Sequence, residues 1–440
     1  MKLTYAELPE LYRLYLQHPQ VSIDSRRVPD GGLFIALRGR TDGNQYAAAA
    51  LAAGAAYAIV DDPEVAAAGD DRYLLVEDGL KALQQLAGRH RAAFRMPVFA
   101  ITGSNGKTTT KELIAAVMSQ QYRVHATPGN YNNHIGLPLT ILSMPPGTEF
   151  LILEMGANHR GEIAELCAIG RPTHGLITNI GTAHLEGFGG QEGIRLGKGE
   201  LYDFLRTNGG VVFVNNDEPQ LADMAQGMSR IIPYFSSEEP SLSVAGLEIK
   251  TLATHPNLRV AFFSEARELV ETDTQLAGKH NLQNVKSAIA VGRYFKVPGA
   301  GICAALSGYR PANHRSQWLT HRGVTFYWDA YNANPSSVGA ALSSFSADSA
   351  PSDSVVVLGE MLELGEAAPA AHRQVALQAG QVARTVLLVG REMAEVAREF
   401  DRPHFADSGQ LAEWFWQQEW AGKKVFVKGS RGNRLERLLD

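Results

Sequence analysis

The stretch ITGSNGKTTT, residues 101–110, strongly constrains this chain, because it predicts a strand that runs directly into a phosphate-binding loop. The apolar run MPVFAIT at 96–102 is typical of a buried strand, and a helix is expected to begin near Lys107. Backbone N–H groups and a helix N-terminus placed in this way can surround phosphate groups. The common loop, G-x-x-x-x-G-K-[ST], is longer, since only two residues separate Gly103 from Gly106 here.

Two interpretations of this short loop are open. In one, Lys107 pairs with the β- and γ-phosphates of a nucleotide, and the Thr108 hydroxyl is offered to Mg²⁺. In the other, the loop is an ordinary Gly-Asn turn before a helix, since the tripeptide G-K-T is common. The strand before the loop and the helix after it favour phosphate binding.

The composition indicates a soluble globular protein of more than one domain. The 440 residues are 45% hydrophobic and 20% charged, and such a length exceeds one core of ordinary size. A net charge of −5 without a long basic run disfavours nucleic-acid binding. The two cysteines, Cys167 and Cys303, are far apart and lack metal-ligand spacing, which fits a reducing compartment.

The sequence predicts neither secretion nor a membrane span. Residues 1–17 carry charges throughout and lack the apolar core of a signal peptide. The longest apolar run, 47–60, is shorter than the roughly 18 residues of a membrane helix. Its alanine-rich part is expected to be a buried helix, followed by the strand AYAIV at 56–60. We therefore expect a cytoplasmic protein.

Short apolar runs alternate with helical patterns along the chain, which predicts parallel α/β units. They form three series, which we divide near residues 95 and 310. The polar carboxyl ends of the middle series lie where open α/β sheets bind ligands. Strands are expected within 33–37, 57–60, 73–76, 96–102, 150–156, 175–181, 211–217, 324–335, 354–361, 385–391 and 424–432, and helices at 78–94 and from about Lys107 to Gln121.

Polar side chains follow two strands of the middle series. Glu154 follows an apolar run, and His184 lies four residues past Ile180 in NIGTAHLEGFGG. If both strands neighbour the loop strand, the carboxylate and the imidazole face a triphosphate and can hold divalent cations. The alternative is a surface salt bridge for Glu154 and a helix cap for His184.

Other polar groups also have a structural and a functional interpretation. Lys198 stands between glycines, where a solvated lysine needs no special explanation. His280, Asn281 and Asn284 lie at the start of an amphipathic helix, where the two amides either read an adenine edge or cap the helix.

Two segments of the last series extend this pattern. WDAYNANPSSV, 328–338, places a carboxylate, a tyrosine and two asparagines at a strand end, which predicts a binding role. HRSQ, 314–317, lies at the expected hinge. Its arginine, Arg315, either reaches a γ-phosphate when domains close or is an exposed linker residue.

In combination, these motifs resemble those of the Mur ligase family, three-domain ATP-dependent ligases of peptidoglycan synthesis. The family's loop has the same two-residue spacing, so the short loop is its normal form. DSRRVPDGGLFIALRG at 24–39 is similar to the segment that holds the uridine nucleotide. The other motifs keep the family's order: TGSNGKTTTKE (102–112), GNYNNHIGLPLTIL (129–142), EMGANHRGEI (154–163), NIGTAHLEGFG (179–189), KGEL (198–201), GKHNLQNVKSA (278–288), DAYNANPSS (329–337) and VKGSRGNRLE (427–436).

The resemblance implies an α/β fold in three domains. A small N-terminal α/β domain at 1–95 would bind the UDP-linked substrate. A central domain at 96–310, a mostly parallel sheet with the phosphate loop and flanking helices, would bind ATP. A Rossmann-like domain at 311–440 would complete the ligase.

The resemblance also implies residue roles, with Lys198 as the lysine that relatives carry as a carbamate to assist a second Mg²⁺. The implied catalytic residues are Lys107, His184, Lys198 and Arg315. The implied Mg²⁺ ligands are Thr108, Glu154, His184 and Lys198. The implied ATP contacts are Gly103, Ser104, Asn105, Gly106, Lys107, Thr108, Thr109, His280, Asn281, Asn284 and Asp329. The implied substrate contacts are Asp24, Ser25, Arg26, Asn130, Asn133, Asn158, His159, Tyr331, Asn332 and Asn334.

By the same resemblance, EMGANHRGEI and DAYNANP indicate the member that joins D-alanyl-D-alanine to a UDP-N-acetylmuramoyl-tripeptide through an acyl phosphate. Such an enzyme needs small-molecule substrates only and can act as a monomer. The chain departs from the family at Asn44, where a histidine is usual, and before the third domain, where a G-R form is more common than YRPANHRSQ.

The rival functions are a sister ligase, a folylpolyglutamate synthase, and a nucleotide-binding regulator without ligase activity. The sequence leaves open whether the tripeptide ends in lysine or diaminopimelate, whether Lys198 is carbamylated, the oligomeric state, and the open or closed domain arrangement.

Overall fold

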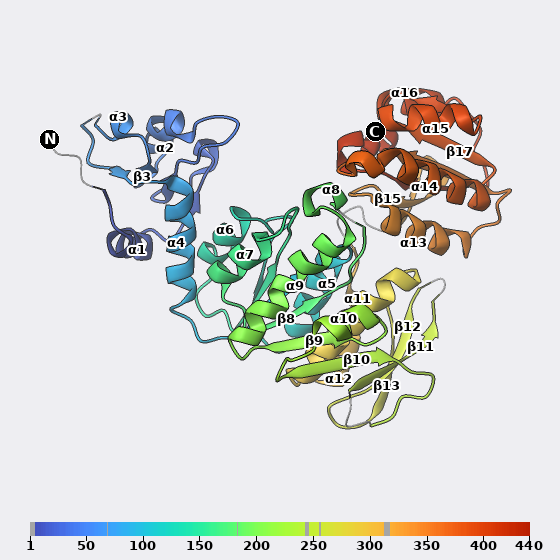
Figure 1. Cartoon of the computed structure of the whole chain (residues 1–440), viewed down its shortest axis with the longest axis horizontal. Helices are drawn as coiled ribbons and strands as arrows, with labels where there is room; N and C mark the ends of the chain where they lie inside the picture. The colour runs from blue at the N-terminus through green and yellow to red at the C-terminus, as the bar shows by residue number, and fades with distance from the viewer. Residues whose placement is uncertain (1–4, 68, 183, 243–245, 255–256, 312–316) are drawn as a thin grey trace.

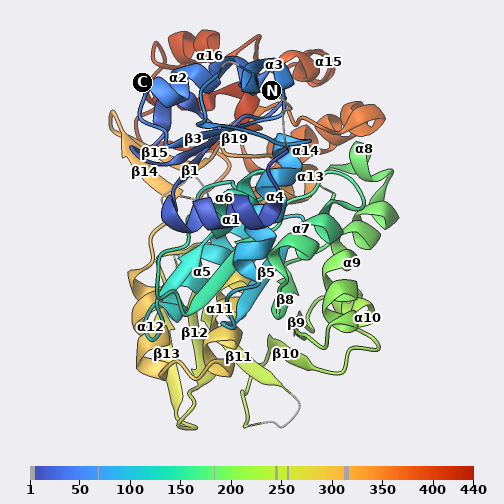
Figure 2. The same ribbon diagram turned by 90° about the vertical axis from the view of Figure 1, so that its left-hand side faces the viewer.

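The phosphate-loop strand lies inside the largest of three sheets in the computed structural model of this protein, which describes residues 5–67, 69–182, 184–242, 246–254, 257–311 and 317–440. These residues form sheets of four, nine and six strands. Figure 1 shows the sheets as three bodies that follow one another along the chain, and Figures 1 and 2 place the first and third toward the same end of the central one. The predicted α/β fold is confirmed, whereas the residue limits of the domains stay predictions.

The first body is a parallel sheet, in the order β1-β2-β3-β4, that is joined to the central body by a long helix. This helix, α4, packs Leu83 and Leu86 into a core shared with the central domain, and Arg91 Nε donates to Gly170 O at 3.0 Å. Its elements are α1 (Leu8–Gln17), β1 (Val21–Ser22), β2 (Leu33–Ile35), α2 (Ala47–Ala52), β3 (Tyr57–Val60), α3 (Pro63–Ala66), β4 (Tyr73–Leu75) and α4 (Gly79–Arg91).

The alanine-rich first part of 47–60 forms a helix as expected, but this helix is buried on one face only. Helix α2 buries one face, made by Ala47, Ala50 and Leu51, while Ala48 and Ala49 are exposed. The chain then turns into β3 as expected.

The central sheet has the order β13-β12-β11-β10-β9-β8-β5-β7-β6 and is parallel except around β12. Its elements are β5 (Val98–Thr102), α5 (Lys107–Met118), β6 (Val124–Ala126), α6 (Gly136–Leu142), β7 (Phe150–Glu154), α7 (Glu162–Gly170), β8 (His174–Ile177), α8 (Leu185–Phe188), α9 (Gln191–Thr207), β9 (Val211–Asn215), α10 (Pro219–Met224), β10 (Ile231–Ser236), β11 (Leu247–Ala253), β12 (Arg259–Phe263), β13 (Leu269–Asp273), α11 (Lys279–Tyr294) and α12 (Gly299–Gly308).

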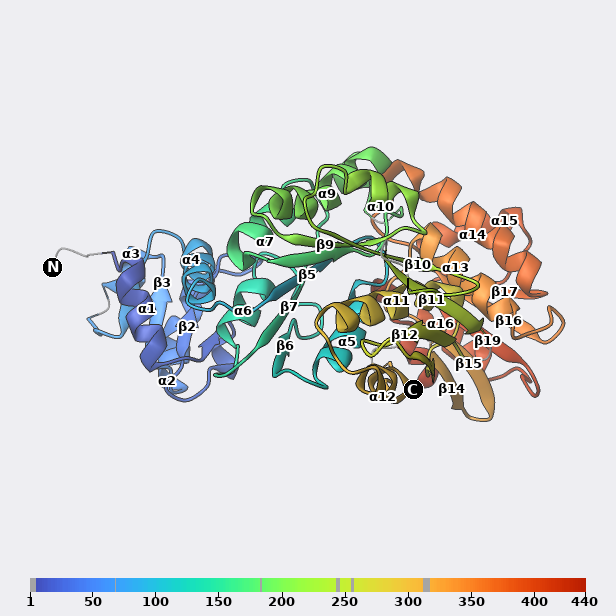
Figure 3. The ribbon, with the colours of Figure 1, turned by 90° about the horizontal axis from the view of Figure 1, so that it is seen from below.

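Strand β5 is apolar from Val98 to Ile101 because both of its faces are covered by helices. Val98 and Ala100 belong to the core beneath α7 and α9, whereas Phe99 and Ile101 belong to the core beneath α5, α11 and α12. Figure 3 shows these two helix layers on opposite sides of the sheet. The sequence analysis missed β10 to β13, and the burial pattern of β10, β11 and β13 is weak, with one buried residue in each strand.

The third sheet has the order β14-β15-β19-β16-β17-β18 and is parallel except for β14. In the described parts of the chain we found no helix whose length and hydropathy suffice for a membrane span. The elements of the third body are β14 (Gln317–His321), β15 (Val324–Asp329), α13 (Pro335–Ser346), β16 (Ser354–Gly359), α14 (Ala368–Val382), β17 (Thr385–Val389), α15 (Ala394–Glu399), β18 (His404–Phe405), α16 (Ser408–Phe415) and β19 (Lys424–Lys428).

Candidate functional site

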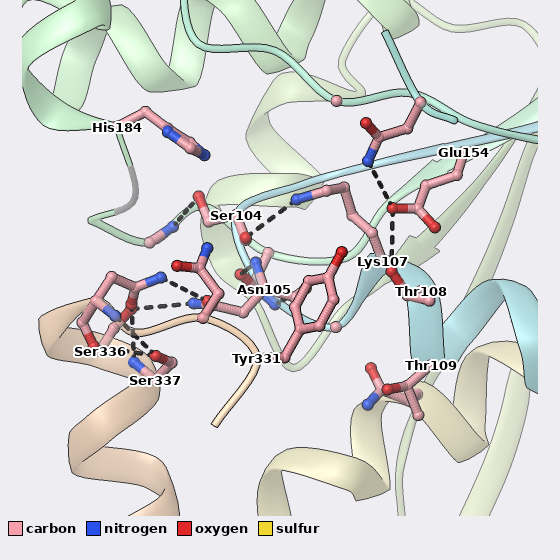
Figure 4. A pocket seen from close by; sticks show the side chains of 18 of the residues that line it. Ser104, Asn105, Lys107, Thr108, Thr109, Glu154, His184, Tyr331, Ser336 and Ser337 are labelled. Atoms are coloured by element: carbon pink, nitrogen blue, oxygen red, sulfur yellow. Dashed lines mark hydrogen bonds between the residues drawn. The ribbon is translucent and has the colours of Figure 1, made fainter. Parts of the chain in front are cut away.

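A cavity of about 690 Å³ lies between the central and third domains, at the carboxyl ends of β5, β7 and β15. Figure 4 shows the phosphate loop, Glu154 and His184 facing the Tyr331–Ser337 segment across it. The predicted site residues that line the cavity are Ser104, Asn105, Gly106, Lys107, Thr108, Thr109, Asn130, Asn133, Glu154, Asn158, His184, His280, Asn281, Asn284, Asp329, Tyr331, Asn332 and Asn334.

The two glycines of the loop are required by its close packing. Gly103 has φ +138°, and a Cβ there would lie 2.0 Å from Thr178 Oγ1. Gly106 has φ +79°, and a Cβ there would lie 2.5 Å from Asn284 Oδ1. A larger residue would therefore clash at either position and would strain the left-handed backbone.

Lys107 begins α5 directly after this loop. Its Nζ donates to Gly103 O at 2.7 Å and to Ser104 O at 3.2 Å, so the ammonium lies along the loop. The first N–H groups of a helix have no intrahelical acceptors, and they carry partial positive charge. This lysine and the start of α5 together make a site suited to an anion.

Glu154 ends β7, which pairs directly with the loop strand β5. Its Oε1 accepts from the Thr108 hydroxyl at 3.1 Å and from Asn132 Nδ2 at 2.8 Å. Its Oε2 lies 3.4 Å from Lys111 Nζ and has no hydrogen-bond partner among the described residues. Glu154 is 1% exposed, so the alternative of a surface salt bridge is wrong.

His184 follows β8, the strand on the other side of β5. It occupies the N-cap position of α8 with φ +58°, but its side chain makes no capping hydrogen bond, so that alternative is also wrong. Its Nδ1 pairs instead with a carboxylate of the third domain, Glu363 Oε2. Burial lowers the pKa of His184, while Glu363 opposes the shift and Lys107 adds to it.

Glu154 and His184 lie on either side of the Lys107 side chain in Figure 4. Among the described residues we found no group of three or more His, Cys, Asp or Glu side chains that could hold a metal ion.

Lys198 lies on α9, behind the wall of the cavity rather than on it. It is 1% exposed, its Nζ donates to Ala157 O at 2.9 Å, and the ammonium lies 4.7 Å from the centre of the Phe188 ring. The interpretation of Lys198 as a solvated lysine is thus wrong. Burial, and then the charge of Lys107, lower the pKa of Lys198 well below its ordinary value.

His280, Asn281 and Asn284 lie together at the start of α11, on the cavity side. The N-cap residue is Gly278, and no side chain caps it in the described structure, so the capping alternative is wrong. Asn284 Nδ2 donates to Asn281 Oδ1 at 3.1 Å, and Asn281 Nδ2 donates to Ala277 O at 2.8 Å. Burial lowers the pKa of His280 to about 4, so the imidazole is neutral at pH 7.

The third domain contributes a buried ion pair at the ends of two neighbouring strands. Lys428 Nζ, at the end of β19, donates to Asp329 Oδ2 at 2.6 Å and to Asn332 O at 3.0 Å. The pair fixes the turn that carries Tyr331. Asn334 caps α13 by accepting from the Ser337 N–H at 2.9 Å.

Several predicted residues do not line this cavity. Gly103 and Lys198 lie behind its wall, while His159 is exposed and pairs with Glu162 at 3.0 Å. Arg315 lies outside the described residues. The remaining three, Asp24, Ser25 and Arg26, lie in the first domain around the short helix Ser25–Arg27.

In the first domain, Asp24 and Asn44 both make hydrogen bonds to nearby side chains. Arg26 donates to both carboxylate oxygens of Asp24 and lowers the pKa of that carboxyl to about 2. Asn44 is 2% exposed, and its Nδ2 donates at 2.7 Å to both Asp42 and Asp61. It therefore ties the loop after β2 to the end of β3.

Other polar residues of the cavity had not been assigned from the sequence. They could have been suspected from the sequence, because most lie inside the motif segments GNYNNHIGLP, NIGTAH, DAYNANPSS and VKGSRG. Which of their neighbours would meet across the cavity depends on strand order. They include Asn132, Asn179, Ser336, Ser337 and Lys428, with Lys111 beneath them.

The chain matches family models and known proteins along nearly its whole length. The matching models are described as the Mur ligase family, catalytic domain (residues 19–91), the Mur ligase middle domain (101–292) and the Mur ligase, glutamate ligase domain (314–431). The chain is 33% identical to the UDP-N-acetylmuramoyl-tripeptide–D-alanyl-D-alanine ligase of Bacillus subtilis and 31% identical to that of Escherichia coli. Both matches cover 100% of this chain and 98% of the relative.

Two solved structures are also similar to this chain along nearly its whole length. A crystal structure of MurF from Acinetobacter baumannii is similar with a TM-score of 0.85 and 26% identity, covering 100% of this chain and 98% of that one. MurF ligase from Thermotoga maritima, solved in complex with ADP, is similar with a TM-score of 0.81 and 27% identity, covering 96% of each chain.

Proposed function

This chain belongs to the Mur ligase family, and we propose that it joins D-alanyl-D-alanine to the terminal carboxylate of a UDP-N-acetylmuramoyl-tripeptide, using ATP. The observation that carries the proposal is the cavity where the phosphate loop of the central domain faces the DAYNANPSS segment of the third. The B. subtilis and E. coli relatives bear this activity in their names.

The first step is phosphoryl transfer. A carboxylate oxygen of the tripeptide forms a bond to the γ-phosphorus of ATP, and the bond from this phosphorus to the β-phosphate oxygen breaks. The products of this step are ADP and an acyl phosphate. The carboxylate and the triphosphate repel each other, so the protein must hold them together and offset their charge. Lys107 and the start of α5 supply that positive charge at the loop.

The second step is acyl transfer. The amine nitrogen of D-alanyl-D-alanine attacks the activated carbonyl carbon, and inorganic phosphate leaves from the tetrahedral intermediate. The nitrogen loses a proton on forming the amide. The protein contributes mainly position and charge, so no Ser or Cys nucleophile is needed. The polar segment around Asn332 and Asn334 lines the third-domain side of the cavity, where we place the acceptor.

The loop side of the cavity fits Mg²⁺ held largely by substrate oxygens. Glu154 Oε2 is buried and accepts no hydrogen bond among the described residues, with Lys111 Nζ 3.4 Å away as its ion-pair partner, and the Thr108 hydroxyl contacts the other oxygen of the same carboxylate. Mg²⁺ in nucleotide sites commonly takes one or two protein ligands and completes its shell with phosphates and water. When bound, the ion would neutralise charge on the β- and γ-phosphates. Thr108 and Glu154 would hold it, while His184 lies on the other side of the Lys107 side chain.

Lys198 fits the carbamate that the family resemblance implies. Its lowered pKa favours the neutral amine, which is the form that adds to CO₂. The nitrogen would form a bond to the carbon of CO₂ and release a proton, so a buried positive charge would become a negative one. The Phe188 ring and Ala157 O contact the amine.

An assay of ADP release with both substrates tests this function. Turnover should require the UDP-linked tripeptide and D-alanyl-D-alanine together. If L-glutamate or a diamino acid served as the better acceptor, the chain would be a sister ligase and the proposal would be wrong. If ATP bound without any turnover, the chain would be a nucleotide-binding regulator.

The proposal also includes the domain limits, the oligomeric state and the location of the protein. We place the UDP-binding, ATP-binding and ligase domains at 1–95, 96–310 and 311–440, respectively. We further propose a monomer, because one chain brings the loop and the DAYNANPSS segment to one cavity, and a cytoplasmic location, where soluble nucleotide-linked precursors and ATP occur together.

A further inference from the structure

The phosphate loop touches the third domain through the side chain of Asn105, while the backbone of Asn105 is fixed within the central domain. The Asn105 N–H donates to Asn179 Oδ1 at 3.0 Å. The Asn105 carbonyl oxygen accepts from Thr178 Oγ1 at 2.6 Å and from Asn179 Nδ2 at 3.0 Å. Since β8 leads directly into residues 178 and 179, the end of this strand holds the loop and aims its side chain.

The Asn105 side chain closes a ring of three hydrogen bonds with Asn334 and Ser336 of the third domain. Asn334 Nδ2 donates to Asn105 Oδ1 at 2.8 Å, and Asn105 Nδ2 donates to Ser336 Oγ at 3.0 Å. The Ser336 hydroxyl donates back to Asn334 Oδ1 at 2.8 Å. Figure 4 shows these contacts between the loop and the start of α13. Each group in the ring both donates and accepts, which strengthens the set as a whole.

The direction of every bond in the ring follows from one helix cap. Asn334 Oδ1 must face the Ser337 N–H that it caps, at 2.9 Å, so its Nδ2 faces Asn105. Asn105 must then present its oxygen to Asn334 and its nitrogen to Ser336. A carboxylate at position 105 could not donate to Ser336, and an alanine could make neither bond.

The contact with the third domain does not involve the groups of the loop that would bind phosphate. The ring uses only the amide of Asn105, whereas an anion would be held by the first N–H groups of α5 and by Lys107. The loop can therefore bind a nucleotide and the third domain at the same time. The short spacing puts the Asn105 side chain directly before Gly106, where the chain turns into α5.

We propose that Asn105 is a positioning residue, which docks the third domain on the phosphate loop instead of contacting phosphate. Docking brings Asp329, Lys428 and Tyr331 to the cavity beside the loop. This inference rests on the proposed function only for its effect on turnover, because the docking itself is a contact between domains.

Two single variants and their double variant test the ring, with a matched control on the same helix. Asn105→Ala and Ser336→Ala should each lower kcat about 5- to 10-fold, as expected for losing one or two hydrogen bonds. The double variant should be no worse than the poorer single variant, because either change opens the ring. Ser346→Ala removes a hydroxyl whose one hydrogen bond among the described residues lies within α13, at Ser343 O, and should leave kcat unchanged.

Nucleotide affinity and domain arrangement distinguish docking from phosphate binding. For Asn105→Ala, the dissociation constant of ADP should stay within about 2-fold of the parent value, because the ring leaves the phosphate-binding N–H groups untouched. Small-angle scattering should show a larger radius of gyration with nucleotide bound than the parent and Ser346→Ala proteins show.

The opposite pattern would overturn the inference. If Asn105→Ala weakened ADP binding as much as it lowered kcat and left the radius of gyration unchanged, Asn105 would be a phosphate ligand. A parent protein without ligase activity would contradict the proposed function instead, and scattering with the ADP titration would still decide the role of Asn105.

Discussion

Lys111→Met should destabilise α5 and β7 beside the phosphate loop, because it removes one partner of a buried ion pair. Lys111 Nζ lies 3.4 Å from Glu154 Oε2, and the two side chains are 4% and 2% exposed. With an effective dielectric constant of about 20, this separation corresponds to an attraction of about 5 kcal/mol. Lys111 also donates to Gly129 O at 3.2 Å, a bond worth about 1 kcal/mol.

The substitution also removes the cost of burying the ammonium, which offsets part of this loss. Breaking a buried pair by removing one partner typically costs about 3–5 kcal/mol, because the other charge stays buried. We expect a loss in that range for the opening free energy of α5 and β7. Lys111→Arg keeps the charge and should lose less, and the double variant Lys111→Met/Glu154→Leu should recover much of the stability, since no lone charge remains.

Native-state hydrogen exchange on the nucleotide-free protein measures this quantity for peptides of α5 and β7 separately. Lys81→Met is the matched control, because Lys81 is an exposed lysine on α4. It should change the opening free energy by less than about 0.5 kcal/mol. A change below about 1 kcal/mol for Lys111→Met would show that the pair gives no net stabilisation, and the reasoning from its burial would fail.

Three further predictions concern the loop lysine, the buried lysine and a buried histidine. Lys107→Ala should lower kcat for ADP release at least about 100-fold, because charge at the transferring phosphate is then uncompensated; intact turnover would contradict the phosphate site. Enzyme depleted of CO₂ should lose activity and regain it when bicarbonate is added. The recovery should become faster as the pH rises toward the lowered pKa of Lys198, because the amine then becomes neutral. The Lys198→Met variant should not respond to bicarbonate. Burial and Arg230 lower the pKa of His174 from 6.5 to about 4, so the folded state binds fewer protons in that window. The contribution of His174 to the free energy of unfolding should be complete above pH 6.5 and fall toward pH 4, by at most about 1.4 kcal/mol per pH unit. The free energy of unfolding of His174→Gln, measured in urea, should lack this pH dependence.

Helices and strands whose pattern lies within one short stretch of sequence could be predicted. The β5–loop–α5 unit was predicted because an apolar run, two glycines and a helical pattern follow one another within about one supersecondary unit. The strands β10 to β13 were missed, since β10, β11 and β13 each have only one buried residue and therefore a weak pattern. The candidate site was predicted in outline, because polar residues at the ends of parallel strands meet at one sheet edge.

The sequence by itself therefore determined the fold class, the family and most residues that line the cavity. The tertiary structure decided which of them touch, because those contacts join distant parts of the chain. Asn105 and Ser336 are 231 positions apart, and only the placement of the third domain brings them within hydrogen-bond distance. Burial likewise decided the state of Lys198: a lysine between glycines looks solvated in sequence, but the packing of α9 against Phe188 excludes water from its amine and lowers its pKa.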